Sequence, residues 1–121
     1  MYELTVESGF AAAHSLREYD GKCENLHGHN WKVQVVLSAE TLDRLGMVMD
    51  FRDVKRHVGE VLDEFDHRHL NELDDFTRQN PTTENLARVL HERLSARVAQ
   101  GIKVEKVTVW ESEKCGAAYR E

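Results

Sequence analysis

The sequence predicts an α+β fold, in which a four-stranded antiparallel sheet carries two helices on one face. Two segments of alternating apolar and polar residues come first, two segments with helical spacing follow, and two short β-rich segments end the chain. The length of 121 residues suits one domain, spanning residues 1–121, with a small hydrophobic core. Such a sheet leaves one face and both edges uncovered, which favours oligomerisation.

Alternation predicts the first two strands. Residues 2–9 alternate between apolar and polar side chains, which is typical of a half-buried antiparallel strand. Residues 10–16 continue this segment with small side chains and include His14. Residues 17–25 are polar and predict a loop. Apolar and polar residues alternate again from residue 27 to residue 38, so we expect a second strand there.

Two helices are expected next. Asp50 is placed to cap the first helix, with Asp53 three residues further on. The apolar stripe of this helix is predicted to join the core, and it consists of Phe51, Val54, Val58, Val61, Leu62 and Phe65. Pro81 and the Thr-Thr-Glu sequence after it predict the start of the second helix, and Gly101 is expected to end it.

Residues 102–111 are rich in valine and predict a third strand, and residues 117–119 predict a short last strand. Glu111 has the same phase as Val107 and Val109. A carboxylate on a buried face is unusual. Either the strand ends there and Glu111 faces water, or its carboxylate has a specific role.

Composition argues against several functional classes. Sixteen basic and twenty-two acidic residues give a net charge of −6 without a basic run, so we expect no nucleic-acid partner. No apolar stretch approaches the ~20 residues of a membrane helix, and the N-terminus lacks the features of a signal peptide. The only two cysteines are Cys23 and Cys115, and we expect a cytoplasmic protein with a free thiol at Cys23.

A candidate metal site is centred on His27-Gly28-His29. On a strand, His27 and His29 leave the same face, and His14 lies on the neighbouring predicted strand. Three imidazoles with one open position are typical of a catalytic zinc site. Cys23, four residues before His27, is then either a fourth ligand that closes a structural site or a reactive thiol beside an open one. The alternative is that these histidines are ordinary polar residues.

Asp66 and His67 form a second candidate pair. An aspartate can orient an imidazole and raise its basicity, and the pair follows directly on an element that is predicted to pack on the core. The alternative is a solvated helix end.

Several short segments form a specific pattern only when taken together. They are Phe10–His14, Cys23 with His27–His29, Met49–Phe51, Asp66-His67, Leu70-Asn71, Asn80–Asn85 and Trp110–Ser112. With this pattern the chain resembles the 6-pyruvoyl-tetrahydropterin synthase family over essentially its whole length. Within it, the three residues between the cysteine and the His-Gly-His resemble the bacterial 6-carboxy-tetrahydropterin synthases of queuosine biosynthesis.

The resemblance implies a T-fold, in which sheets of three subunits join into a barrel and two trimers stack into a homohexamer with active sites between subunits. It implies zinc as the cofactor, bound by His14, His27 and His29. Cys23 is implied as the catalytic thiol, with Asp66 and His67 as its relay partners. Glu111 is implied to bind the amino-pyrimidine edge of a pterin, with help from Thr82 and Thr83.

The implied reaction converts 7,8-dihydroneopterin triphosphate into 6-carboxy-5,6,7,8-tetrahydropterin with loss of triphosphate and acetaldehyde. The alternatives are a pyruvoyl-forming enzyme or a side-chain-cleaving relative with the same site, or a zinc-stabilised binding module without turnover. His69 departs from the family pattern, which has tyrosine there. The relay base is therefore His67 or His69, and we favour His67 because it follows the aspartate directly.

Overall fold

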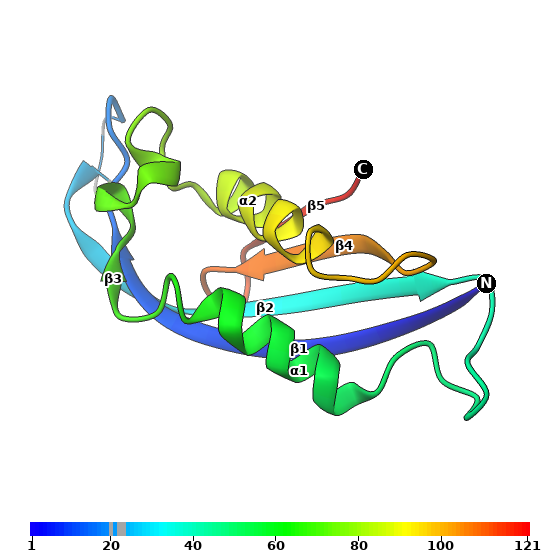
Figure 1. The fold of residues 1–121 in the computed structure, drawn as a ribbon. Helices are drawn as coiled ribbons and strands as arrows, with labels where there is room; N and C mark the ends of the chain where they lie inside the picture. Colours follow the sequence, from blue (N-terminus) through cyan, green and yellow to red (C-terminus); the bar gives the residue numbers. More distant parts are fainter. Residues whose placement is uncertain (20, 22–23) are drawn as a thin grey trace.

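The computed structural model describes residues 1–19, 21 and 24–121. The described strands form one curved sheet in the order β3-β1-β2-β4-β5 (Figure 1). The elements are β1 (Tyr2–His14), β2 (His27–Ala39), α1 (Phe51–Leu62), β3 (Arg68–His69), the short 3₁₀ helices Leu70–Glu72 and Asp74–Phe76, α2 (Thr83–Ser95), β4 (Lys103–Trp110) and β5 (Gly116–Tyr119). The prediction of an α+β fold is confirmed, but the sheet of the described residues has five strands instead of the predicted four.

The additional strand is β3, which pairs in parallel with Ala12 and Ala13 of β1. The sheet is therefore mixed, although the other strand pairs are antiparallel. For Asp66 and His67, the sequence left a solvated helix end as the alternative to a functional pair. In the structure, the backbone N–H of His67 instead donates to the carbonyl of Ala11. This hydrogen bond attaches the segment to the edge of the sheet.

Both helices lie on the same face of the sheet (Figure 1). Helix α1 packs on β1, and α2 packs on β4 and β5. The caps agree with the sequence, because Asp50 accepts from the backbone N–H of Arg52 and Thr82 accepts from that of Asn85. Between helices and sheet lies one hydrophobic core that includes Phe10, Trp31, Phe65, Leu90 and Val107.

Two details of the helix predictions are wrong. Phe51 was expected in the core but is 52% exposed, because it is the first residue of α1 and lies beyond the part of the helix that covers the sheet. Helix α2 ends at Ser95 rather than at Gly101. Gly101 has φ +92° and lies in the turn before β4, where a left-handed backbone favours glycine.

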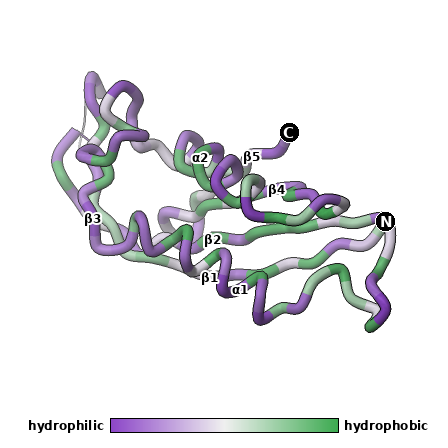
Figure 2. Tube along the Cα trace, in the orientation of Figure 1, coloured by the Kyte–Doolittle hydropathy of each residue, from purple (hydrophilic) through white to green (hydrophobic). Residues whose placement is uncertain are grey.

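The opposite face of the sheet carries polar side chains. Apolar and polar residues alternate along β1 and β2, as Figure 2 shows, so one face joins the core and the other does not. On the uncovered face, Lys32 lies 3.7 Å from Glu7 and over the ring of Trp110.

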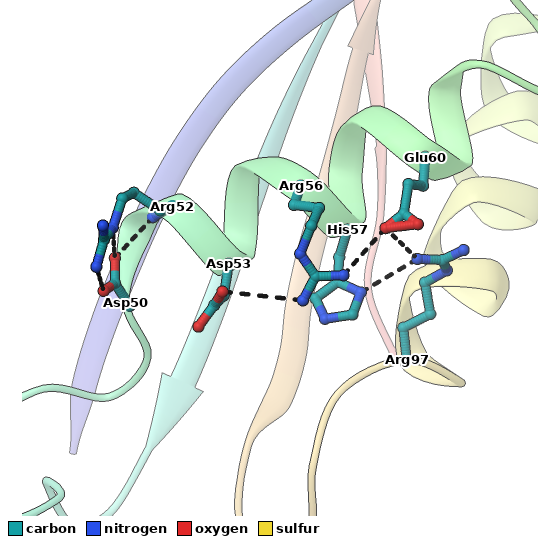
Figure 3. A network of polar contacts seen from close by, with 7 residues as sticks. All are labelled: Asp50, Arg52, Asp53, Arg56, His57, Glu60 and Arg97. Atoms are coloured by element: carbon teal, nitrogen blue, oxygen red, sulfur yellow. Dashed lines mark hydrogen bonds and ion pairs between the residues drawn. The ribbon is translucent and has the colours of Figure 1, made fainter.

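Exposed ion pairs connect the outer side of α1 with the segment after α2 (Figure 3). Arg56 bridges Asp53 and Glu60, while Arg97 contacts Glu60 and donates to Nδ1 of His57. Because these groups are largely exposed, each pair stabilises the fold by at most about 1 kcal/mol. No helix in the described part of the chain is long and apolar enough to cross a membrane.

Candidate functional site

The strand register brings the three predicted histidines together. His14 ends β1 and His27 begins β2, and the two residues face each other in the antiparallel register. His29 is two residues further along β2, so its side chain leaves the same face. The ring centroids of His14 lie 4.6 Å from His27 and 5.2 Å from His29, and those of His27 and His29 are 4.8 Å apart. The alternation of side chains along β2 and the antiparallel pairing of β1 with β2 thus produce the cluster.

Backbone carbonyls fix the orientation of two of these rings. Nδ1 of His14 donates to the carbonyl of Pro81 at 2.8 Å, and Nδ1 of His27 donates to that of Asn25 at 2.7 Å. Because a carbonyl oxygen only accepts, each neutral ring carries its proton on Nδ1 and leaves Nε2 as a free lone pair.

The donor atoms fit a metal ion. One ring nitrogen from each histidine lies within 4.8 Å of the others. The Nε2 atoms of His14 and His29 are buried and have no hydrogen-bond partner in the described part of the chain. Buried polar atoms of this kind are costly unless a ligand engages them. Three imidazoles, two of which are hydrogen-bonded through Nδ1 to backbone carbonyls, are a donor set that suits zinc.

Burial lowers the pKa values of His14 and His29, because it disfavours the charged ring. The neighbouring histidines act in the same direction. For His14 the hydrogen bond to Pro81 and the charge of Glu111 oppose the shift, and for His29 the charge of Glu111 opposes it. Both rings are therefore neutral at neutral pH, in the protonation state that binds a metal.

Glu111 follows β4 directly and faces the histidines. Its Oε2 accepts a hydrogen bond from the hydroxyl of Thr83 at 3.2 Å and lies 3.9 Å from Nε2 of His29. Its side chain is 36% exposed, which leaves acceptor capacity for a ligand. Thr83 is the first residue of α2, so the backbone N–H groups of that helix end point toward the same region.

His14, Thr83 and Glu111 line one cleft of about 410 Å³. Its described lining comprises His14, Leu16, Arg17, Glu18, Tyr19, Asn80, Thr82, Thr83, Glu84 and Glu111. The volume is within the range of small-molecule sites. The structure therefore places the predicted residues Thr82, Thr83 and Glu111 beside the histidine cluster.

Asp66 and His67 form the predicted pair, with Oδ2 of Asp66 3.0 Å from Nδ1 of His67. Oδ1 of Asp66 also accepts from the backbone N–H of Ala11 at 2.9 Å. This hydrogen bond and the contact with His67 lower the pKa of Asp66. His67 has φ +58°, a strained conformation for a non-glycine residue, and its side chain is 82% exposed.

The pair lies at the edge of the sheet and is not part of the described lining of the cleft. His69, the other candidate base, contacts Glu72 at 3.3 Å instead of Asp66. Cys23 lies outside the described residues, so its predicted role stays a prediction.

Sequence reasoning missed the part of the site that surrounds His14. It assigned no role to the Pro81 carbonyl or to Tyr19. The side chains of Asn71 and Asn80 were assigned no role either, although both belong to segments of the family pattern. A single sequence carries no periodic signal for such contacts, because they join irregular segments.

Comparisons with known proteins agree with this geometry. The family described as 6-pyruvoyl tetrahydropterin synthase matches residues 3–121. A protein of Archaeoglobus fulgidus that is provisionally named 6-carboxy-5,6,7,8-tetrahydropterin synthase is 40% identical over 117 residues, covering 97% of this chain and 94% of that protein. The dihydroneopterin monophosphate aldolase of Pyrococcus furiosus is 37% identical over 113 residues, covering 93% of this chain and 92% of the aldolase.

The structure of 6-pyruvoyl tetrahydropterin synthase from Caenorhabditis elegans superposes with a TM-score of 0.86 at 33% identity, covering 100% of this chain and 97% of that one. This likeness confirms the expected T-fold. From the sequence match and the shared fold together, the chain belongs to the 6-pyruvoyl tetrahydropterin synthase family.

Proposed function

We propose that the protein converts 7,8-dihydroneopterin triphosphate and water into 6-carboxy-5,6,7,8-tetrahydropterin, triphosphate and acetaldehyde, as a cytoplasmic enzyme of queuosine and 7-deazapurine biosynthesis. The observation that carries the proposal is that one cleft is lined by His14, a member of the three-histidine cluster, and by the Glu111–Thr83 pair. The name of the Archaeoglobus relative supports this reaction over others in the family.

The proposed metal is zinc, held by His14, His27 and His29. Bound there, zinc would supply Lewis acidity to hydroxyl groups of the substrate side chain and make the neighbouring C–H bond more acidic. Glu111 would accept hydrogen bonds from a ring N–H and the exocyclic amine of the pterin, a bidentate match for a carboxylate. The Thr83 hydroxyl, which donates to Oε2, would hold that carboxylate in place.

We assign proton transfer to Cys23, as the thiol that removes the proton, and to Asp66 and His67, as the pair that relays it. Because Asp66 and His67 lie at the sheet edge, we propose that they act in the cleft of a neighbouring subunit. The proposed assembly is a homohexamer, built as a dimer of trimers, with active sites between subunits.

A second candidate activity is aldol cleavage of dihydroneopterin monophosphate, as in the name of the Pyrococcus relative. The charge of the cleft favours it, because its described lining has three carboxylates, from Glu18, Glu84 and Glu111, against the single guanidinium of Arg17. A triphosphate would meet more repulsion there than a monophosphate. Cleavage between the first two side-chain carbons would leave a hydroxymethyl group on the ring.

Product analysis tests the proposal. The zinc-loaded protein is incubated with the triphosphate or the monophosphate of 7,8-dihydroneopterin, and products are identified by mass spectrometry. We expect the 6-carboxy product and acetaldehyde in equal amounts. A pyruvoyl product without acetaldehyde would reject this reaction, and a hydroxymethyl product would support the aldolase.

The two cysteines provide a matched control. Cys23→Ala is expected to lower kcat by about 10²–10⁴-fold, the usual loss for a general base. Cys115→Ala should leave kcat unchanged, because Cys115 is exposed in the turn before β5. Full activity of Cys23→Ala would reject Cys23 as the thiol that removes the proton. No activity of the wild type with any pterin would favour a zinc-stabilised binding module.

A further inference from the structure

The chain beyond β1 is held by two asparagine side chains in place of a neighbouring strand. The backbone N–H of Ser15 donates to Oδ1 of Asn71 at 2.9 Å, and Nδ2 of Asn71 donates to the carbonyl of Ser15 at 2.8 Å. Asn80 makes the same pair of hydrogen bonds with Arg17, at 2.9 and 3.0 Å. Each side-chain amide thus satisfies one backbone donor and one acceptor, as a paired strand would.

This arrangement fixes the position of the Arg17 side chain at the cleft. One terminal nitrogen of the guanidinium donates to the carbonyl of Gln79 at 3.2 Å and the other donates to that of Asn71 at 3.1 Å. Two of its five N–H groups are used in this way, and three are left. Arg17 lines the same cleft as His14 and Glu111.

The charge of Arg17 is not neutralised by a described carboxylate. Within the described residues, no carboxylate oxygen lies within 4.0 Å of its guanidinium, whereas Arg93 pairs with Glu64 and Asp75. A fixed guanidinium with free N–H groups is suited to bind a phosphate in bidentate geometry. The other charged side chains in the described cleft lining, apart from the histidine, are carboxylates, which repel phosphate.

We propose that Arg17 determines specificity by binding a phosphate of the substrate side chain, and that Asn71 and Asn80 are positioning residues for its guanidinium. The proposal rests on the function proposed above. Glu111 and Arg17 would then bind opposite ends of the ligand, the pterin ring and the phosphate, with the histidine cluster at the side chain between them.

The test compares ligands with and without phosphate. Affinity is measured by calorimetry for 7,8-dihydroneopterin and for inorganic tripolyphosphate, and kcat/KM is measured for 7,8-dihydroneopterin triphosphate. We expect Arg17→Gln to weaken tripolyphosphate binding and to lower kcat/KM about tenfold to hundredfold, the usual loss for a hydrogen bond to a charged group. Affinity for dihydroneopterin should stay within about threefold. The tripolyphosphate affinity and kcat/KM of Arg17→Lys should lie between those of the wild type and Arg17→Gln, because lysine keeps the positive charge but cannot donate two parallel hydrogen bonds as a guanidinium can.

Arg44→Gln is the matched control, because Arg44 is also exposed but lies in the loop before α1, away from the cleft. It should change neither ligand affinity nor kcat/KM. If Arg17→Gln weakens the binding of dihydroneopterin as much as that of tripolyphosphate, or changes neither affinity, the phosphate assignment is wrong. Turnover of no pterin together with Arg17-dependent tripolyphosphate binding would overturn the proposed reaction and leave the phosphate site standing.

The positioning role has a separate readout. Asn80→Ala should weaken tripolyphosphate binding in the wild type. In the Arg17→Gln background it should cause no further loss of affinity, because Asn80 acts only by positioning the guanidinium of Arg17. The zinc content should not change in either background. An equal loss from Asn80→Ala in both backgrounds would show that Asn80 acts on the fold rather than on Arg17.

Discussion

Hydrogen bonds to backbone carbonyls orient two rings of the histidine cluster. The sequence predicts that the three histidines cluster, but it does not predict these hydrogen bonds. Periodicity alone places His27 and His29 on one face, and pairing with the preceding strand brings His14 to them. The contact that sets the protonation of His14 comes from the carbonyl of Pro81, 67 residues away in a segment between two helices. No local pattern predicts it, so the sequence could predict the cluster but not which nitrogen carries the proton.

The lowered pKa values of His14 and His29 predict how the stability of the metal-free protein depends on pH. In the unfolded chain both rings take up protons near their ordinary pKa of 6.5. The folded state resists protonation, so the unfolded state binds more protons below this pH. The free energy of unfolding should therefore fall as pH drops below about 6.5, and level off below the folded-state pKa values.

Thermal unfolding of the metal-free protein between about pH 8 and pH 5 checks this expectation. Zinc should raise Tm most at the high end, because protons compete with the metal for the rings. His14→Gln should reduce both the pH slope and the zinc effect. The same substitution at His57, which lies on α1 outside the histidine cluster, should change neither. A Tm that is independent of pH would contradict the neutral state of the buried rings.

At the scale of elements, the helices and long strands could be predicted because each carries a regular apolar pattern. The predicted 2–9 and 10–16 segments are one strand, β1, of 13 residues. β3 was missed because two residues, Arg68 and His69, carry no alternation, and their pairing depends on the edge of β1. The end of α2 was misplaced because Gly101, the expected stop signal, belongs to the next turn.

Gly9 lies where β1 and β2 approach each other closely, so a larger side chain there should be destabilising. A Cβ added there would lie 2.8 Å from the backbone carbonyl oxygen of Trp31, which cannot move without disturbing the strand pairing. Gly9→Ala should therefore destabilise the protein by about 1–3 kcal/mol. Gly59, inside α1, has open space around its Cβ position. Gly59→Ala should stabilise the protein by about 0.5–1 kcal/mol, because alanine favours a helix.

Urea unfolding of the two variants, followed by circular dichroism, gives both free energies relative to the wild type. The two variants are expected to change the free energy of unfolding in opposite directions. A neutral or stabilising Gly9→Ala would mean that the two strands can separate locally without loss, and the close approach would then have no energetic role.

At the scale of the whole molecule, the open edge of β1 suggests how subunits join. Among the described strands, β3 pairs with β1 only at Ala12 and Ala13, so no described strand pairs with the part of that edge before Ala11. The N–H and C=O of Ala11 point to this edge, where they bond to Asp66 and His67. Because backbone groups alternate with period two, the N–H of Thr5 points the same way.

Thr5→Pro removes that N–H without affecting the pairing of β1 with β2, and edge strands tolerate proline. If the barrel of the proposed hexamer joins subunits through this edge, the variant should stay folded but fail to assemble. Light scattering should give about six times the 14.0 kDa of one chain for the wild type and a smaller mass for the variant. Thr5→Ala keeps the N–H and should assemble normally. A Thr5→Pro protein that still assembles fully would exclude the β1 edge as the subunit contact. Joining of subunits through this edge would then not explain why one face of the sheet is polar and uncovered.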